Sequence, residues 1–438
     1  VRPDLRHVLG SANMAHYMDA RHGSERVARE LVLPFLADTF EDTFAAATGA
    51  DLVVAHPLTF TARLVAEKLG IPWLSTTLAP MLFLSSHDPP VLPAAPWLAS
   101  LRSLGPGPHR LVVDMARRMT APWFGTLTAL RARLGLPAAG HPLFEGAFST
   151  HGTLALFSPL FGPPQSDWPP RTIVTGFCFL DHPKLDPLPE GLDRFLGAGD
   201  PPVVFTLGTS AVHDARDFYT HAIEHACRLG RRAVLLTGRE TGNQVTAGPD
   251  VFVADYAPYS RLFPHAAAIV HQGGVGTTAE ALRSGRPMLV LPFSHDQFDN
   301  AARVRRMGSG DTLDRHRWGG SPGRERLARL LDSRERRADA ARNGERVRGE
   351  DGVGRAVAAL LEVLERHGPE VTSESRSERV QARAPTGVPG ASGVVLRAQP
   401  GPGATKERLD SRPSAPQARV EAGGERTAWS LDPSPDAG

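Results

Sequence analysis

The segment HAAAIVHQGGVGTTAEALRSGRPMLVLPF, from His265 to Phe293, carries a complete strand, turn, helix and strand pattern. HAAAIVHQ is an apolar run of strand length, and the glycines after it predict a tight turn. A helix is expected over GTTAEALRSG, ending at Gly285, and RPMLVLPF predicts a second strand. This order of elements is typical of a parallel βαβ unit, whose crossover is almost always right-handed.

The same alternation continues on both sides of this segment. Nearer the N-terminus, a long helical pattern over 24–50 carries Pro34, which predicts a kink or a break. The α/β pattern predicts two doubly wound domains built on parallel sheets. The remaining expected elements are strands at 51–56, 71–77, 202–210, 231–238 and 250–258, and helices at 58–70 and 215–230.

The length of 438 residues exceeds what one hydrophobic core usually supports, which also favours two domains. We expect an N-terminal domain over 1–180, a linker over 181–202 and a second domain over 203–366. Within the first domain, the Pro-, Ser- and Gly-rich segment 86–122 predicts loops and short helices. The polar segment 367–438 has few apolar residues and is predicted to be a disordered tail.

Composition excludes several classes of function. The net charge of +2 provides no electrostatic case for binding nucleic acid or a membrane. Cys178 and Cys227 are the only cysteines, without the spacing of a zinc site or a disulfide framework, so a reducing cytoplasm fits best. No apolar run reaches the roughly 18 residues of a transmembrane helix, so no transmembrane segment is expected.

The turn after the strand predicts a ligand site. Gly273, Gly274 and Gly276 allow close backbone approach, and Thr277 and Thr278 stand where a helix N-cap is expected. Free N–H groups at a helix start above the strand ends favour an anion such as phosphate. A purely structural turn is the alternative, because neither the P-loop nor the dinucleotide fingerprint matches.

Two polar residues follow the next strand. Asp296 and Gln297 come just past its carboxyl end, so they should open on the same crevice as His271. A carboxylate beside an amide can accept and donate hydrogen bonds, which suits the vicinal hydroxyls of a sugar. A plain helix N-cap at Asp296 is the alternative. Together the two loops predict a site for a sugar nucleotide.

The segment HQGGVGTTAEALRSGRPMLVLPFSHDQFDNAARVRRMG resembles the donor-binding motif of the UDP-glycosyltransferase superfamily. VVFTLGTS, VFVADYAPYSRLFPHAAAIVHQGG and DPPVLP are also similar to that family, in particular to its bacterial rhamnosyltransferase and sterol glucosyltransferase branches. The resemblance covers about 49–366. It implies a GT-B fold, in which two Rossmann-like domains face a cleft.

The resemblance also implies roles for individual residues. It makes His271 a pyrophosphate ligand, and places Gly274, Gly276, Thr277 and Thr278 around the phosphates. Glu280 corresponds to the ribose-hydroxyl acceptor, and Asp296 and Gln297 to the sugar-hydroxyl pair. Thr209 and Ser210 fall on a phosphate-contacting loop, and the segment from Tyr256 to Pro258 falls on the loop that holds the base.

The family transfers a sugar with inversion and without a metal or other cofactor, the co-substrate being a UDP- or dTDP-sugar. A general base must take the proton of the acceptor hydroxyl. In the family this base is a histidine that corresponds to a position upstream of Val1, so we expect the first domain to lack its first part. His7, His16 and His22 are available, but each lies in a polar segment without that loop's glycines.

Three functions therefore stay open. The first is transfer of a hexose to a hydroxyl of a small lipophilic acceptor, and the second is a non-catalytic nucleotide-sugar-binding paralogue or a fragment. A nucleotide-sugar 2-epimerase on the same fold is disfavoured, because Asp296 and Gln297 follow the transferase pattern. The partners expected are the nucleotide sugar and the acceptor, with no nucleic acid and with peripheral membrane contact left open.

Overall fold

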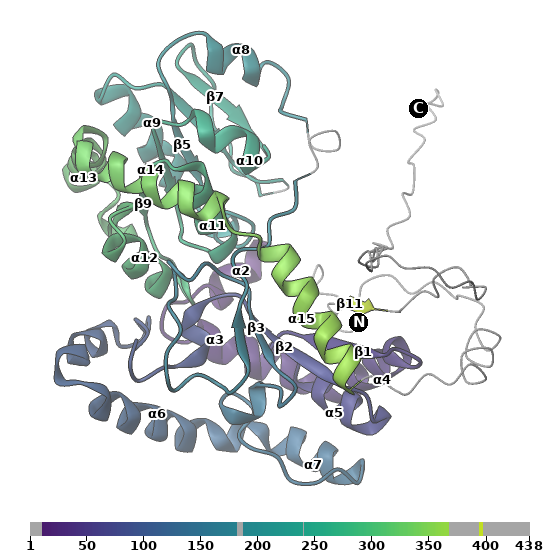
Figure 1. Ribbon diagram of the computed structural model, residues 1–438. Helices are drawn as coiled ribbons and strands as arrows, with labels where there is room; N and C mark the ends of the chain where they lie inside the picture. The colour runs from purple at the N-terminus through teal and green to yellow at the C-terminus, as the bar shows by residue number, and fades with distance from the viewer. Residues whose placement is uncertain (1–10, 182–186, 240, 368–393, 397–438) are drawn as a thin grey trace, which may run out of the picture.

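The computed structural model describes residues 11–181, 187–239, 241–367 and 394–396. The chain forms two α/β domains, each built around a sheet, with the second above the first in Figure 1. This is the doubly wound arrangement that the alternation of strands and helices predicts. The boundaries 1–180, 181–202 and 203–366 stay predictions, although the last helix departs from them as described below.

The first sheet has the strand order β11-β1-β2-β3-β4, and three pairings place β1 to β4 parallel to one another. The strands are β1 (Leu52–Ala55), β2 (Trp73–Thr77), β3 (Thr153–Ala155), β4 (Thr172–Val174) and β11 (Val394–Leu396). β11 pairs antiparallel with β1. It lies inside the segment predicted to be a disordered tail, so that prediction is wrong for these three positions; 368–393 and 397–438 lie outside the described residues.

The predicted helix over 24–50 is confirmed, including its irregularity. A wide π-type turn at Val27–Val32 and a 3-10 turn at Leu33–Phe35 separate α3 (Gly23–Arg26) from α4 (Leu36–Ala47). Pro34 stands at the break, because it has no N–H for the helical ladder. α5 (Phe60–Leu69) ends at Gly70, whose φ of 66° is left-handed, as its sequence predicts.

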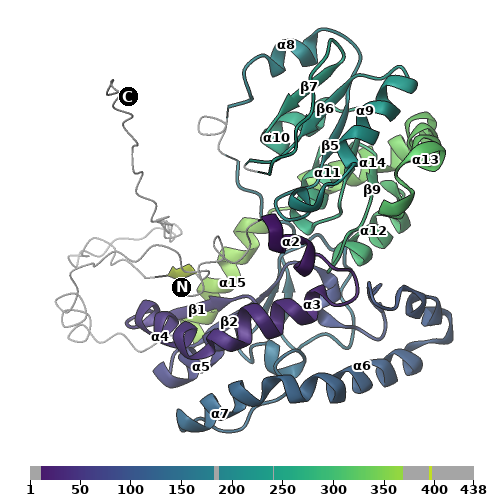
Figure 2. The same ribbon diagram turned by 180° about the vertical axis from the view of Figure 1, so that it is seen from behind.

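The prediction of loops and short helices over 86–122 is wrong in its second half. A 3-10 helix spans Pro96–Leu104, and then α6 (Pro106–Thr120) runs for four turns along the side of the first domain away from the second (Figures 1 and 2). Its prolines occupy the first turn, where no intrahelical N–H bond is needed. The prolines and glycines near residue 106 therefore mark the start of a helix and not a loop. A further helix, α7 (Gly125–Arg133), follows.

The second sheet is parallel throughout, with the order β10-β9-β8-β5-β6-β7. Its strands are β5 (Val203–Thr206), β6 (Ala233–Leu236), β7 (Val251–Ala254), β8 (Ala268–His271), β9 (Met288–Val290) and β10 (Gly310–Thr312). Its helices are α8 (Leu192–Gly197), α9 (Phe218–Arg228), α10 (Tyr259–Leu262), α11 (Val275–Ser284), α12 (Gln297–Arg306), α13 (Gly320–Asp332) and α14 (Arg334–Arg348).

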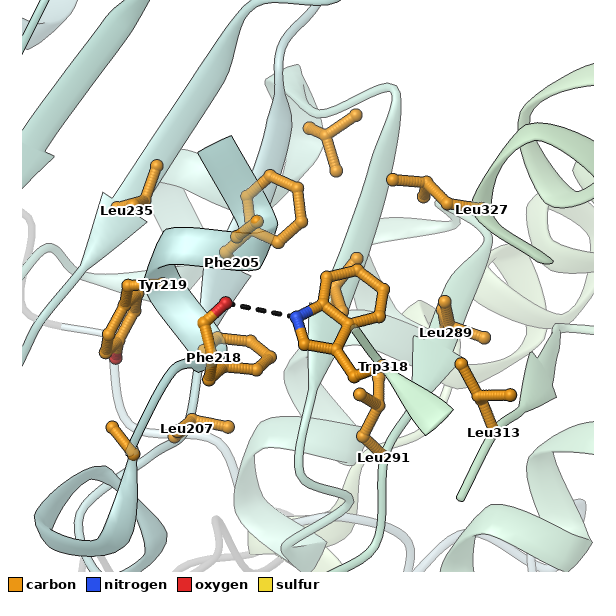
Figure 3. Packing of buried hydrophobic residues seen from close by; sticks show 14 of the residues in the cluster. Phe205, Leu207, Phe218, Tyr219, Leu235, Leu289, Leu291, Leu313, Trp318 and Leu327 are labelled. Atoms are coloured by element: carbon orange, nitrogen blue, oxygen red, sulfur yellow. Dashed lines mark hydrogen bonds between the residues drawn. The ribbon is translucent and has the colours of Figure 1, made fainter. Parts of the chain in front are cut away.

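Trp318 closes the core on one face of this sheet (Figure 3). Its ring stacks on Phe218 at a centroid distance of 5.8 Å, and its Nε1 donates to the carbonyl of Phe218 at 3.0 Å. The indole N–H of Trp318 thus has a hydrogen-bond acceptor, as buried tryptophans usually do. This core packs against the strands whose carboxyl ends carry the predicted site.

The last long helix joins the two domains. α15 (Gly352–His367) follows the second domain in sequence but packs Ala359 and Val363 against the first sheet, beside Leu74 and Leu154 (Figure 1). The sequence places nearly all of this segment inside the expected second domain, 203–366. Its apolar positions match the face of the first sheet, and periodicity alone does not say which sheet a helix covers.

A buried ion network also crosses between the domains. Arg303 on α12 contacts Asp299 through Nε at 2.6 Å and Asp88 through Nη1 at 2.6 Å. Arg303 is 1% exposed and Asp299 is 0% exposed. The backbone N–H of Val91 donates to Asp299 at 3.1 Å. The segment DPPVLP, which begins at Asp88, is therefore part of the interface that holds the first domain against the second.

The N-terminal helices reach the second domain as well. Met14 and Met18 of α2 (Ser11–Tyr17) and the turn after it pack in the core cluster of Val212 and Phe293. Ser24 hydrogen-bonds Nδ1 of His295 at 3.0 Å in the loop after β9. These contacts place the start of the described chain beside the strand-end loops of the second domain, as Figure 2 shows.

Candidate nucleotide-sugar site

The predicted site lies where neighbouring parallel strands of the second sheet end. β9, β8 and β5 are adjacent, so the loops at their carboxyl ends share one edge. The side chain of Gln272, after β8, stands against Gly208, after β5. Nδ2 of Asn300 donates to the carbonyl of Gly273 at 2.9 Å, which ties the β8 loop to α12. The structure therefore brings the three predicted loops together.

The N-terminal end of α11, where the sequence predicts an anion, is partly exposed. Its N-cap is Gly274 and its first residue is Val275, so Thr277 and Thr278 lie in the first turn and not at the N-cap as predicted. Thr278 Oγ1 donates back to the carbonyl of Gly274 at 2.9 Å, and both threonines are buried. Gly276 is exposed. The unpaired N–H groups of the first turn are therefore the donors that this end offers to an anion.

His271 is enclosed by the protein. It is 0% exposed at the end of β8, its Nδ1 accepts from the N–H of Gly273 at 3.1 Å, and its Nε2 lies 3.4 Å from Sδ of Met288. Burial lowers the pKa of His271 to about 3, so the ring is neutral at physiological pH. The structure therefore gives His271 a role in shaping the glycine turn, whereas the sequence predicts a direct phosphate ligand.

In the loop after β9, the side chain of Gln297 hydrogen-bonds within the loop, whereas the carboxylate of Asp296 is partly exposed. Oε1 of Gln297 accepts from the N–H groups of Phe293 and Ser294 at 2.8 and 3.1 Å, which fixes the loop conformation. Oδ2 of Asp296 accepts from Nδ2 of Asn300 at 2.8 Å. Asp296 stands at the N-cap position of α12 but makes no capping hydrogen bond, so the plain N-cap alternative is not what the structure shows.

Burial raises the pKa of Asp296 from its ordinary 3.8 to about 6. The folded state therefore keeps the proton to a higher pH than the unfolded state, and the free energy of unfolding falls as the pH rises between these values. We expect a loss of about 2 to 3 kcal/mol from pH 4 to pH 7, with no further change above. Urea unfolding at a series of pH values measures it.

The variant Asp296→Asn is the control for this pH dependence. Its amide oxygen can still accept from Asn300 but does not titrate, so the variant should lack this part of the slope and be the more stable protein at pH 7. An identical slope in both proteins between pH 4 and pH 7 would show that the carboxyl of Asp296 is not the group responsible.

Residues expected to hold the base and ribose line one cavity of about 1040 Å³. Tyr256, Pro258 and Glu280 form part of its wall. Glu280 is paired with Arg283 at 2.9 Å, and burial raises the pKa of its carboxyl. Arg283 also binds Asp181 in a bidentate pair at 2.7 and 2.9 Å. The cavity is thus wide enough for a nucleoside and carries an acceptor beside it.

The other predicted residues lie as follows. Thr209 and Ser210 are exposed in the loop after β5, ahead of a 3-10 helix at Ala211–Asp214. Of the candidate bases, His16 pairs with Glu30 at 2.8 Å on the surface. His22 pairs with Asp19 at 3.2 Å, also on the surface, and His7 lies outside the described residues.

Two site residues were missed from the sequence. Gln272 and Asn300 are buried polar side chains at the loop junction, and each has one oxygen without a hydrogen-bond partner in the part of the chain that the structure describes. Their positions beside Gly273 and Asp296 were the available signal. Among the same described residues no cluster of three or more His, Cys, Asp or Glu side chains is placed to hold a metal ion.

Among the described residues, no helix has the length and apolarity to cross a membrane. Two doubly wound α/β domains, with a helix start and a carboxylate at the strand ends of the second, are the arrangement of the GT-B fold. The site lies at the edge of the sheet where ligands of such folds bind.

Comparisons place the chain within this class. The model of the erythromycin biosynthesis protein CIII-like C-terminal domain matches residues 222–351. The chain is 30% identical over 372 residues to vancomycin aglycone glucosyltransferase of Amycolatopsis orientalis, covering 83% of this chain and 87% of that protein. The chain therefore belongs to the UDP-glycosyltransferase superfamily.

A second relative is O-mycaminosyltylonolide 6-deoxyallosyltransferase of Streptomyces fradiae, 38% identical over 269 residues. This match covers 60% of the chain and 61% of the relative, so it spans less than two thirds of that protein. The solved spinosyn rhamnosyltransferase SpnG, complexed with thymidine diphosphate, superposes with a TM-score of 0.53 at 18% identity, covering 82% of this chain and 83% of SpnG. The structural likeness shows the shared fold.

Proposed function

We propose that this protein transfers a hexose-type sugar from a UDP- or dTDP-sugar to a hydroxyl of a small lipophilic acceptor, with inversion and without a metal ion. The observation that carries the proposal is that Asn300 links the carboxylate of Asp296 to Gly273 just before the start of α11, at one sheet edge. A cavity lined by Glu280 lies along the same helix. The names of the relatives support a sugar donor of this kind, since one transfers a glucosyl group and the other a 6-deoxyallosyl group.

The chemistry follows from where charge develops. As the acceptor hydroxyl attacks the anomeric carbon and gives its proton to a general base, the bond to the diphosphate breaks and negative charge grows on the leaving oxygens. Fixed N–H donors at the start of α11 stabilise this charge in the transition state more than in the ground state. Above pH 6 the ionised carboxylate of Asp296 accepts hydrogen bonds from sugar hydroxyls and orients the sugar.

Binding and transfer are tested separately on the whole chain. Calorimetry with UDP, dTDP, UMP and TMP should show the diphosphates binding at least about tenfold more tightly than the monophosphates, because the second phosphate reaches the start of α11. Transfer is then followed by mass spectrometry with UDP-glucose, dTDP-glucose and dTDP-rhamnose against a panel of lipophilic alcohols. A folded protein that binds neither diphosphate contradicts the proposal.

A second candidate is binding of a nucleotide sugar without transfer. It is favoured because the two described candidate bases, His16 and His22, each pair with a carboxylate on the surface. Tight diphosphate binding combined with no glycosylated product from any acceptor would support it. Product formation would exclude it.

A further inference from the structure

Exposed apolar side chains gather on one short segment of the first domain. Of the eleven large hydrophobic residues that are exposed in the described chain, five lie between positions 97 and 119. They are Trp97, Leu104, Leu111, Met115 and Met119, and between 55% and 73% of each is exposed. Such a cluster of exposed apolar residues marks a binding surface on a folded protein.

Three of these residues share one face of α6. Leu111, Met115 and Met119 are spaced four residues apart, so they form an apolar stripe along the outer side of the helix. The opposite side, with the buried His109 and the half-buried Val113, faces the first domain. α6 runs along the side of the first domain away from the second (Figures 1 and 2), so the stripe lies apart from the candidate nucleotide-sugar site.

Exposed charged side chains follow one flank of this stripe. Arg110, Asp114 and Arg118 are also spaced four residues apart, so positive, negative and positive charges alternate along the helix. An anionic lipid surface would attract the two arginines but repel the carboxylate of Asp114. A second copy of α6 that runs in the opposite direction can place opposite charges against each other. The charge pattern therefore favours a second copy of this chain over a membrane.

We infer that α6 is a homodimer interface, in which the α6 helices of two copies pack antiparallel about a two-fold axis near Val112. In such a pair the same flank of each helix meets itself, and every contact occurs twice. Arg110 of each copy then faces Asp114 of the other, and the two Leu111 side chains pack together at the axis. The interface covers the apolar stripe on the outer side of each first domain, so the candidate nucleotide-sugar site of each copy stays open.

Sedimentation equilibrium of the full chain, at a series of micromolar concentrations, should show a reversible monomer–dimer equilibrium. Leu111→Gln combined with Met115→Gln should weaken dimerisation at least about a hundredfold, because both copies lose two buried apolar side chains. Both positions are exposed and glutamine is a good helix former, so circular dichroism should show an unchanged fold. Leu361→Gln, at an exposed leucine of α15, is the matched control and should not change the equilibrium.

Exchanging charges tests the antiparallel arrangement. Asp114→Arg replaces two attractive contacts per dimer by two repulsive ones, so it should weaken dimerisation about tenfold. Adding Arg110→Asp restores opposite charges with their positions exchanged, so the dissociation constant should return to within about threefold of the original. A general disturbance of α6 by Asp114→Arg would not be repaired by the second change. Asp193→Arg, at an exposed aspartate of α8, is the matched control for charge and should have no effect.

The outcomes are distinct. A chain that stays monomeric at every concentration overturns the inference, and its co-sedimentation with vesicles of anionic phospholipid would show that the stripe docks on lipid instead. A dimer that both the glutamine and the charge variants leave intact also overturns it, because the dimer then forms through another surface. Dimerisation is measured without nucleotide or acceptor, so the proposed function stands or fails independently of the result.

Discussion

Arg303→Met should lower the free energy of unfolding by about 3 to 5 kcal/mol. Arg303 is the cation that faces the fully buried Asp299, and it also binds Asp88 across the domain interface. Methionine fills most of the volume of the arginine stem but leaves the Asp299 carboxylate buried without a counter-charge. Urea unfolding followed by circular dichroism and by tryptophan fluorescence measures the loss.

Two variants show whether charge is the cause. Arg305→Met makes the same change at an exposed arginine two positions away on α12 and should alter stability by about 0.5 kcal/mol or less. Adding Asp299→Asn to Arg303→Met removes the stranded charge and keeps an acceptor for the N–H of Val91, so it should recover about half of the loss or more. A double variant as unstable as the sum of both single variants would contradict this account.

Gly273→Ala should cost about 2 to 5 kcal/mol of stability and weaken donor binding at the same time. Gly273 has a φ of 89°, a conformation that residues with a Cβ rarely adopt. The added Cβ would lie 2.6 Å from Cγ1 of Val290 on the neighbouring strand. The turn between β8 and α11 must then shift, and with it the N–H groups at the start of α11 that we propose as diphosphate donors. Urea unfolding and calorimetry with dTDP or UDP measure the two effects.

Gly276→Ala is the matched control in the same segment. Gly276 is helical, and an added Cβ would have nothing within 4 Å. Alanine should therefore stabilise α11 by about 0.5 to 1 kcal/mol, since glycine is a poor helix former. Equal stability losses in the two alanine variants would show that the cost at Gly273 does not come from its backbone conformation and close packing.

Much of the second domain could be predicted because its signals are local. Strand-length apolar runs and left-handed glycines such as Gly285 mark where β8, α11 and β9 begin and end. Parallel strand order then places Asp296 and the glycine turn on one edge without knowledge of any contact. The prediction for α6 failed because its prolines, read as loop residues, occupy a helix start.

The sequence by itself determined the α/β class, the GT-B resemblance and the edge of the sheet at which a sugar nucleotide should bind, because periodicity, glycine turns and strand polarity are properties of neighbouring residues. Only the tertiary structure decided which polar groups reach the crevice. It enclosed His271, left Oε1 of Gln272 without a hydrogen-bond partner among the described residues, and packed α15 on the first sheet. Burial and hydrogen-bond partners depend on segments that are distant in the chain, so no local pattern could have settled them.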